Sequence, residues 1–84
     1  MQLMESRRFD IAAIYVPTKR RATLDPARVE AIAQSMLEVG QETPILVRAD
    51  GARWVLVEGL HRLEAARALG ETSILGIVVQ ARRH

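Results

Sequence analysis

The sequence predicts a small α+β domain with the element order β-α-β-β-α-β, in which a mixed four-stranded sheet stands beside two main helices. Three observations predict this class. Residues 25–40 carry a helical apolar stripe between a capping residue and a glycine, two β-branched runs flank an Asp-Gly pair at 50–51, and a second helical segment at 59–70 precedes a final β-branched run. With 84 residues, 49% of them apolar, the chain forms one domain with its core at about 9–80.

The first two elements are a strand and the clearest helix of the chain. "FDIAAIYV" at 9–16 predicts a short strand. Asp25 can cap the helix that follows, Pro26 suits its first position and Gly40 can close it. Its apolar positions lie on one stripe, which predicts one buried face: Val29, Ile32, Ala33, Met36 and Leu37.

The second half of the chain predicts a hairpin, a helix and a last strand. "ILVRADGARWVLVE" at 45–58 places Asp50-Gly51 between two β-branched runs, which is a strong hairpin signal. "GLHRLEAARALG" at 59–70 consists of good helix formers with Gly70 as its stop, and "TSILGIVVQ" at 72–80 is typical of a strand. Trp54 is expected to pack in the core or against the hairpin.

Composition excludes several kinds of chemistry. The chain has no cysteine, which excludes disulfides, thiolate metal sites and thiol catalysis. Its two histidines, His61 and His84, are too few for a metal site without carboxylate help, so we predict no structural metal. The apolar runs at 45–47 and 74–79 are far shorter than the ~20 residues of a membrane span, and the start lacks the apolar core of a signal peptide. We therefore expect a cytoplasmic protein with no membrane partner.

The start of the second helix is the first candidate site. If Gly59 is its cap, the backbone N–H groups of Leu60, His61 and Arg62 have no capping side chain to accept their hydrogen bonds. A helix start already carries partial positive charge, so each basic side chain there costs about 0.3 to 1 kcal/mol. A bound phosphate would complete this arrangement, and the glycine would let it approach the backbone. In the competing interpretation, water caps the amides and a neighbouring glutamate neutralises Arg62.

A second basic cluster precedes and enters the first helix. Lys19, Arg20 and Arg21 stand in an expected loop, and Arg28 falls in the first turn of the helix. If the two helix starts converge, these residues would form one polyanion pocket; the alternative is a solvated charge run. Arginine outnumbers lysine eleven to one. This excess favours phosphate binding, because the planar guanidinium can donate two hydrogen bonds to a phosphate. A coding bias toward arginine would produce the same composition.

No catalytic motif identifies itself. Asp25, Glu30 and Glu58 are weak candidates for a general base or a Mg²⁺ ligand, and Asp25 is also the expected helix cap. The sequence contains no GxGxxG, Walker loop or nucleophile elbow. The basic tail "ARRH" at 81–84 is expected to be a frayed end, with contact to nucleic acid as the alternative.

Across residues 9–80 the chain resembles the ParB N-terminal / sulfiredoxin superfamily. The matching pieces are "IYVPTKRR", "LDPARVEAIAQSM", "VGQETPILVR", "WVLVEGLHRLEAARALG" and "TSILGIVV", in the family's order. The resemblance implies a nucleoside triphosphate, ATP or CTP, as ligand with Mg²⁺, its phosphates held by residues of the helix start and the basic segment. Those positions are Gly59, Leu60, His61, Arg62, Arg28, Arg20 and Arg21.

Two departures limit what the resemblance implies. Leu60 stands where sulfiredoxins have their reactive cysteine, so reduction of a sulfinic acid is excluded. Partition ParB proteins usually continue into helix-turn-helix and dimerisation segments, and the 84 residues end before such segments. We therefore expect a nucleotide-binding module acting in DNA partition or DNA-linked regulation, with DNA, a second copy or another protein as further partner. The alternatives are a small enzyme, either a phosphotransferase or a ParB-like nuclease, and an interaction domain that ignores nucleotides.

Overall fold

The computed structural model describes residues 5–80, which form one mixed sheet and a stack of two main helices. The basic tail at 81–84 lies outside the described residues. In chain order the elements are β1 (Arg7–Asp10), a 3₁₀ turn (Ile11–Ala13), β2 (Ile14–Tyr15), α1 (Thr18–Arg21), α2 (Pro26–Val39), β3 (Ile45–Asp50), β4 (Arg53–Glu58), α3 (Leu60–Ala68) and β5 (Ser73–Val78). The expected α+β class and the two main helices are confirmed.

The sheet has the strand order β1-β5-β3-β4-β2. The hairpin of β3 and β4 is antiparallel, as the Asp50-Gly51 pair predicts, and β5 lies parallel to β3 on its other side. β1 pairs antiparallel with β5 at one edge, and β2 pairs parallel with β4 at the other. The sheet therefore has five strands over the described residues, and the prediction of four is wrong.

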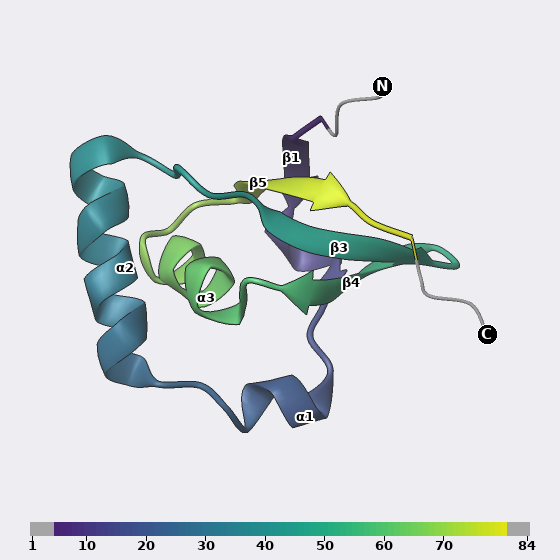
Figure 1. The fold of residues 1–84 in the computed structure, drawn as a ribbon, viewed down its shortest axis with the longest axis horizontal. Coiled ribbons are helices and arrows are strands. Elements are labelled where there is room, and N and C mark those ends of the chain that lie inside the picture. Colours follow the sequence, from purple (N-terminus) through teal and green to yellow (C-terminus); the bar gives the residue numbers. More distant parts are fainter. Residues whose placement is uncertain (1–4, 81–84) are drawn as a thin grey trace.

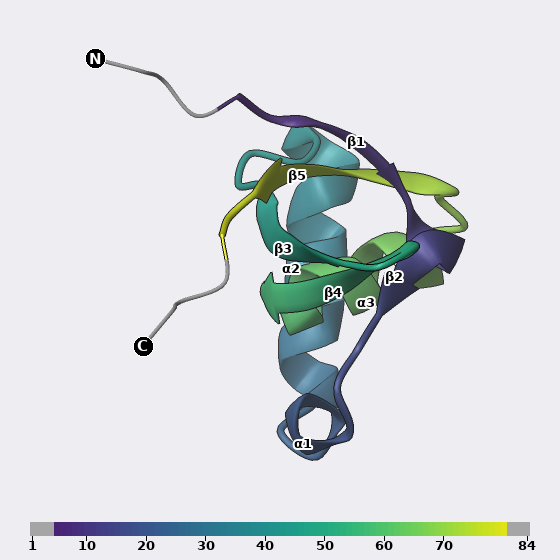
Figure 2. The ribbon, with the colours of Figure 1, turned by 90° about the vertical axis from the view of Figure 1, so that its right-hand side faces the viewer.

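The extra strand arises because the segment predicted as one strand, 9–16, divides in two. A continuous strand starting with Phe9 inward would turn Ile14 and Val16 outward, since side chains alternate between the two faces. The 3₁₀ turn resets this alternation, so that Phe9, Ile11, Ile14 and Val16 are all buried. Figure 2 shows the chain passing from β1 at one edge, through this turn, to β2 at the other.

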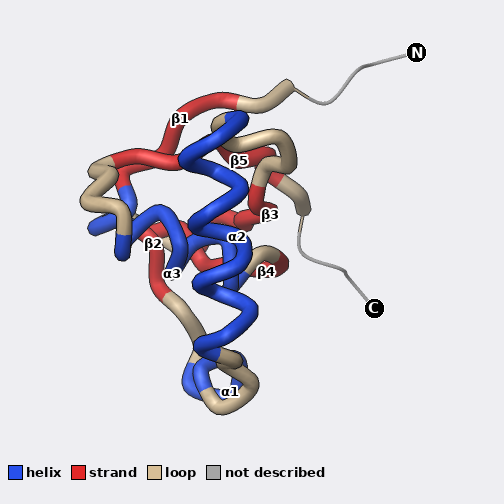
Figure 3. The backbone as a smooth tube through the Cα atoms, turned by 90° about the vertical axis from the view of Figure 1, so that its left-hand side faces the viewer, coloured by secondary structure: helices blue, strands red, loops and turns tan. Residues whose placement is uncertain are grey.

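The helices form two layers on one side of the sheet. Figures 1 and 3 show α3 between the sheet and α2, with α2 crossing its outer side. Leu63, Ala65 and Ala66 of α3 are fully or almost fully buried, because both sides of this helix are covered. On α2 no residue of the predicted stripe is fully buried: Val29, Ile32, Ala33 and Met36 are partly buried, and Leu37 keeps 68% of its surface exposed. The expected single buried face is thus present only in part.

The ends of the helices follow the predicted local signals. The Asp25 carboxylate accepts a hydrogen bond from the Ala27 backbone N–H at 3.1 Å, Pro26 opens α2 and Gly40 closes it with φ +80°. Gly70, also at φ +80°, follows α3. Trp54 packs at the edge of the core as expected, its ring edge-on to that of Phe9 at 5.1 Å between centroids.

Candidate phosphate-binding pocket

The start of α3 has no side-chain cap within the described part of the chain. Gly59 is the N-cap residue, with φ +109° and ψ 30°, and the first bond back to it comes from the Leu63 N–H to the Gly59 carbonyl oxygen at 2.9 Å. The N–H groups of Leu60, His61 and Arg62 precede that bond, so the helix itself supplies them with no acceptor. This end of α3 therefore presents three donors and the positive end of the helix dipole.

Gly59 is required here for two separate reasons. Its φ lies in the left-handed region, which side-chain-bearing residues rarely adopt. An added Cβ would also lie 2.7 Å from Cγ2 and 3.3 Å from Cα of the fully buried Ile45. The turn from β4 into α3 therefore runs directly against β3, which holds the α3 start at the end of the sheet.

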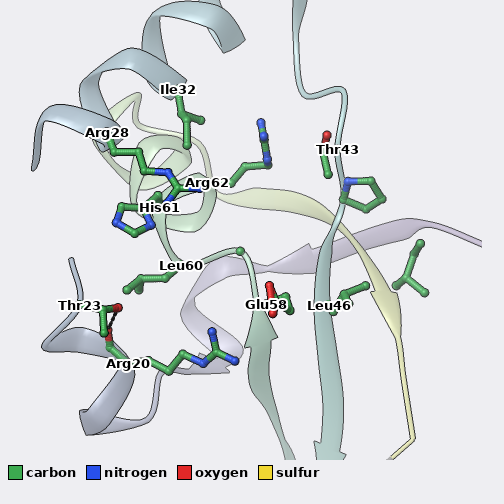
Figure 4. A pocket seen from close by; sticks show the side chains of 13 residues that line it. Arg20, Thr23, Arg28, Ile32, Thr43, Leu46, Glu58, Leu60, His61 and Arg62 are labelled. Atoms are coloured by element: carbon green, nitrogen blue, oxygen red, sulfur yellow. Dashed lines mark hydrogen bonds between the residues drawn. The ribbon is translucent and has the colours of Figure 1, made fainter. Parts of the chain in front are cut away.

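A pocket of about 870 Å³ opens at this helix start. It is bounded by the starts of α2 and α3, by α1, and by the adjoining ends of β3, β4 and β5 (Figure 4). Its lining residues are Arg20, Thr23, Arg28, Ile32, Thr43, Pro44, Leu46, Glu58, Gly59, Leu60, His61, Arg62 and Ile77. The two helix starts thus converge on one cavity, as the polyanion-pocket hypothesis requires.

Three arginines from three different helices line this pocket. Figure 4 shows Arg20 of α1 and Arg28 of α2 extending toward the cavity from two sides, with Arg62 of α3 across from Arg20. Among residues 5–80, ion pairs join Arg53 to Asp50 and Arg67 to Glu64, and no ion pair includes any of the three pocket arginines. These three guanidinium groups are therefore available to pair with an anion that enters the pocket.

The remaining predicted phosphate residues occupy different positions. Leu60 is buried in the core at 5% exposure, so its contribution to the pocket is mainly its backbone. Arg21 lies outside the pocket lining, and its Nε donates to the Val16 carbonyl oxygen at 3.4 Å. His61 lines the pocket, but its Nε2 accepts a hydrogen bond from the Asp25 backbone N–H at 3.0 Å.

The three candidate carboxylates are not brought together. Glu58, the last residue of β4, lines the pocket beside Gly59. Asp25 caps α2 through its carboxylate, and Glu30 is exposed on α2 outside the pocket lining. Within the described residues, no three His, Asp or Glu side chains gather at a point where a metal ion could sit. Glu58 is thus the carboxylate that could act on a ligand in this pocket.

Sequence reasoning missed one whole wall of the pocket. This wall comes from the residues before and within β3 and from the end of β5: Thr43, Pro44, Leu46 and Ile77. The hairpin register could have located part of it, because β3 starts where β4 ends. However, a regular hairpin register counted from the turn would pair Leu46 with Val57. In the structure the register shifts between Leu46 and Val47, so that Leu46 pairs with Glu58 instead.

Residues 2–84 match the ParB N-terminal domain family, and the chain therefore belongs to that family. The probable chromosome-partitioning protein ParB of Campylobacter jejuni is 32% identical over 62 residues. Those residues are 74% of this chain and 22% of the relative, so the chain spans about a fifth of that protein.

Solved structures show the same fold. Sulfiredoxin from Arabidopsis thaliana superimposes with a TM-score of 0.82 at 23% identity, over 92% of this chain and 86% of that one. The C-terminally truncated chromosome-partitioning protein ParB from Caulobacter crescentus, complexed with CTP-γ-S, has a TM-score of 0.79 at 27% identity, over 93% of this chain and 46% of that one. A free serine kinase in complex with ADP has a TM-score of 0.76 at 17% identity, over 88% and 30%. The fold is thus shared by proteins of different activities.

No helix among residues 5–80 is both long enough and apolar enough to cross a bilayer.

Proposed function

We propose that this chain is a nucleoside-triphosphate-binding module of the ParB type, with CTP as its preferred ligand and ATP as the competing one. The observation that carries the proposal is the uncapped start of α3, whose free N–H groups open into a pocket with three unpaired arginines. A triphosphate supplies acceptors for these donors and charge for these guanidinium groups. The CTP-γ-S complex of the Caulobacter relative supports the choice of CTP.

Within the pocket we assign the phosphates to the basic side and the base to the apolar side. The phosphates would be held by Arg20, Arg28 and Arg62 together with the N–H groups at the start of α3. The base would lie against the pocket wall from β3 and β5 that includes Leu46 and Ile77. An apolar wall beside a few placed polar groups is typical of small-molecule sites. Arg21 is a weaker candidate, because it would have to leave the Val16 carbonyl to reach the ligand.

A Mg²⁺ ion fits this arrangement as a companion of the nucleotide. Magnesium sites at phosphates usually use one or two carboxylates together with phosphate oxygens and water. Glu58 is the carboxylate in the pocket lining, so it would provide the protein ligand. The ion would reduce the charge of the triphosphate and help to orient it.

We propose that binding acts as a switch in DNA partition or DNA-linked regulation. Nucleotide and Mg²⁺ would bridge α1, α2 and α3, since each of these helices contributes one arginine to the pocket. Holding α1, α2 and α3 in fixed positions would change the shape of a surface that contacts DNA, a second copy of the chain or another protein. Binding of the chain to DNA only in the presence of CTP would support this role. DNA binding that does not depend on nucleotide and weakens steeply with salt would instead support a simple interaction domain.

Enzymatic turnover is the second candidate, and Glu58 is the observation that favours it. A carboxylate next to a phosphate site can act as a general base or hold the metal ion of a phosphoryl transfer. Turnover that Glu58→Gln abolishes while nucleotide binding remains would establish it. Binding without turnover would favour the switch.

Isothermal titration calorimetry with Mg²⁺ and CTP, ATP or GTP tests the proposed site. Replacing Arg62 or Arg28 with alanine removes charge-assisted hydrogen bonds and is expected to weaken CTP binding about 10- to 100-fold. The matched control is Arg53→Ala, since Arg53 is paired with Asp50 away from the pocket. Trp54 is the second residue of β4 and Glu58 is its last, so the tryptophan lies at the opposite end of the strand from the pocket and calorimetry is preferable to its fluorescence. Absence of binding to all three nucleotides at millimolar concentration would reject the proposal.

A further inference from the structure

His61 connects the starts of the two main helices. Its Nε2 accepts a hydrogen bond from the backbone N–H of Asp25 at 3.0 Å, although the two residues are 36 positions apart. In Figure 4 the imidazole turns away from the centre of the pocket, while Arg28 beside it extends inward. Because an N–H donates this bond, Nε2 must carry a lone pair and the imidazole must be neutral, with its proton on Nδ1.

The bond fixes the residue that caps α2. The Asp25 carboxylate accepts a hydrogen bond from the Ala27 backbone N–H, and the Asp25 backbone N–H donates to His61. Both bonds hold Asp25 at the start of α2. Arg28, in the first turn of α2, lines the pocket three residues further on. His61 therefore connects the helix start that carries Arg28 to the helix start that carries Arg62.

The side chains that line the empty pocket with His61 carry mostly positive charge. Arg20 of α1, Arg28 of α2 and Arg62 of α3 line the same cavity, and the positive ends of α2 and α3 meet there. The acidic groups on these helices are Asp25, which caps α2, Glu30 and Glu38 of α2, and Glu64 of α3, which pairs with Arg67. Glu58 at the end of β4 also lines the pocket. A bound polyphosphate would bring several negative charges into the same space and would reverse this balance.

We propose that His61 is a proton-coupled latch between α2 and α3. The neutral imidazole holds Asp25 in the empty pocket, and polyphosphate binding favours the imidazolium, which takes up a proton from solvent. The imidazolium carries N–H donors on both ring nitrogens and can no longer accept from the Asp25 N–H. The latch then opens and His61 becomes a donor to the phosphates. The opening step rests on the proposed phosphate site, whereas the closed latch does not.

The closed latch is tested without nucleotide by ¹⁵N NMR between about pH 8 and pH 6, where histidine changes its charge. The Asp25 amide resonance is expected to move together with the His61 ring nitrogens in the wild-type protein. In His61→Gln the Oε1 stands as many bonds from Cα as Nε2 and accepts without titrating, so the Asp25 resonance should stay constant. An Asp25 amide that does not respond while the His61 ring titrates would overturn the latch, whether or not the protein binds nucleotides.

The opening of the latch is tested by calorimetry at pH 7 in buffers of different ionisation enthalpy. Wild-type protein is expected to take up more protons per bound CTP than His61→Gln, by at most about one proton. Proton exchange by the nucleotide itself is common to both proteins and cancels in this difference. Inorganic tripolyphosphate should give the same difference, because the phosphates drive the step. Equal proton uptake by the two proteins would overturn the coupling, while failure of either protein to bind CTP would instead reject the proposed function.

Discussion

Replacing Gly59 with alanine combines two costs that the structure allows to be separated. The residue has φ +109°, and a side-chain-bearing residue with positive φ costs about 1–2 kcal/mol. The new Cβ would stand 2.7 Å from Cγ2 and 3.0 Å from Cβ of Ile45, which is fully buried in β3. Because the chain must shift to relieve this contact, overpacking adds about 1–3 kcal/mol. The free energy of unfolding should therefore fall by roughly 2–5 kcal/mol.

The assay is urea unfolding followed by far-UV circular dichroism, with Gly70→Ala as the matched control. Gly70 also has positive φ, at +80°, but an added Cβ there has no atom within 4 Å. This control should lose only the backbone contribution of about 1–2 kcal/mol. The difference between the two variants measures the contact with Ile45. Equal losses in the two variants would refute the close packing of the α3 start against β3.

Three further predictions concern single side chains. Asp25→Ala removes the cap on the Ala27 N–H and should lower the free energy of unfolding by about 1 kcal/mol in urea. Gln41→Ala removes the amide that bonds both the N–H and the carbonyl of Leu75, at 2.8 and 2.9 Å, and should lose about 1–3 kcal/mol with faster exchange of the Leu75 amide hydrogen. Glu58→Gln removes a negative charge from the pocket and should tighten CTP binding about two- to fivefold without Mg²⁺ and abolish the gain from Mg²⁺, as measured by calorimetry.

Each of these three has an outcome that would contradict it. An Asp25→Asn variant retains an acceptor for the Ala27 N–H and should keep most of the free energy of unfolding. If Asp25→Asn lost as much stability as Asp25→Ala, the capping hydrogen bond would not be the cause of the loss. Unchanged exchange at Leu75 would show that the Gln41 amide does not protect β5. A Glu58→Gln variant that still responds fully to Mg²⁺ would exclude Glu58 as its ligand.

Signals that lie within a few residues of one another were sufficient for most of the elements. The bounds of α2 could be predicted from Asp25, Pro26 and Gly40. The side-chain cap at the start and the positive φ of the glycine at the end are both set by neighbouring residues. Asp50-Gly51 gives the hairpin for the same reason. The division of 9–16 into two strands depends instead on which sheet edge each half joins. β1 pairs with β5 and β2 pairs with β4, and both partners lie far along the chain.

The candidate site was predictable in its chemistry and only partly in its geometry. The missing cap at Gly59 and the basic residue Arg62 beside it pointed to an anion from sequence alone. That Arg20 and Arg28 reach the same cavity while Arg21 does not depends on how α1 and α2 pack, which no local pattern encodes. The bond between His61 and Asp25 spans the two helices and was likewise beyond sequence reasoning.

Mapping the backbone amides of the ¹⁵N-labelled chain during titration with CTP and Mg²⁺ tests the central claim most directly. We predict saturable shifts that are largest at the N–H groups of Leu60, His61 and Arg62, with further shifts around Arg28, and a loss of these shifts in Arg62→Ala. Shifts that are absent at millimolar CTP, or that centre on the far end of the hairpin near Trp54, would contradict a phosphate site at the start of α3.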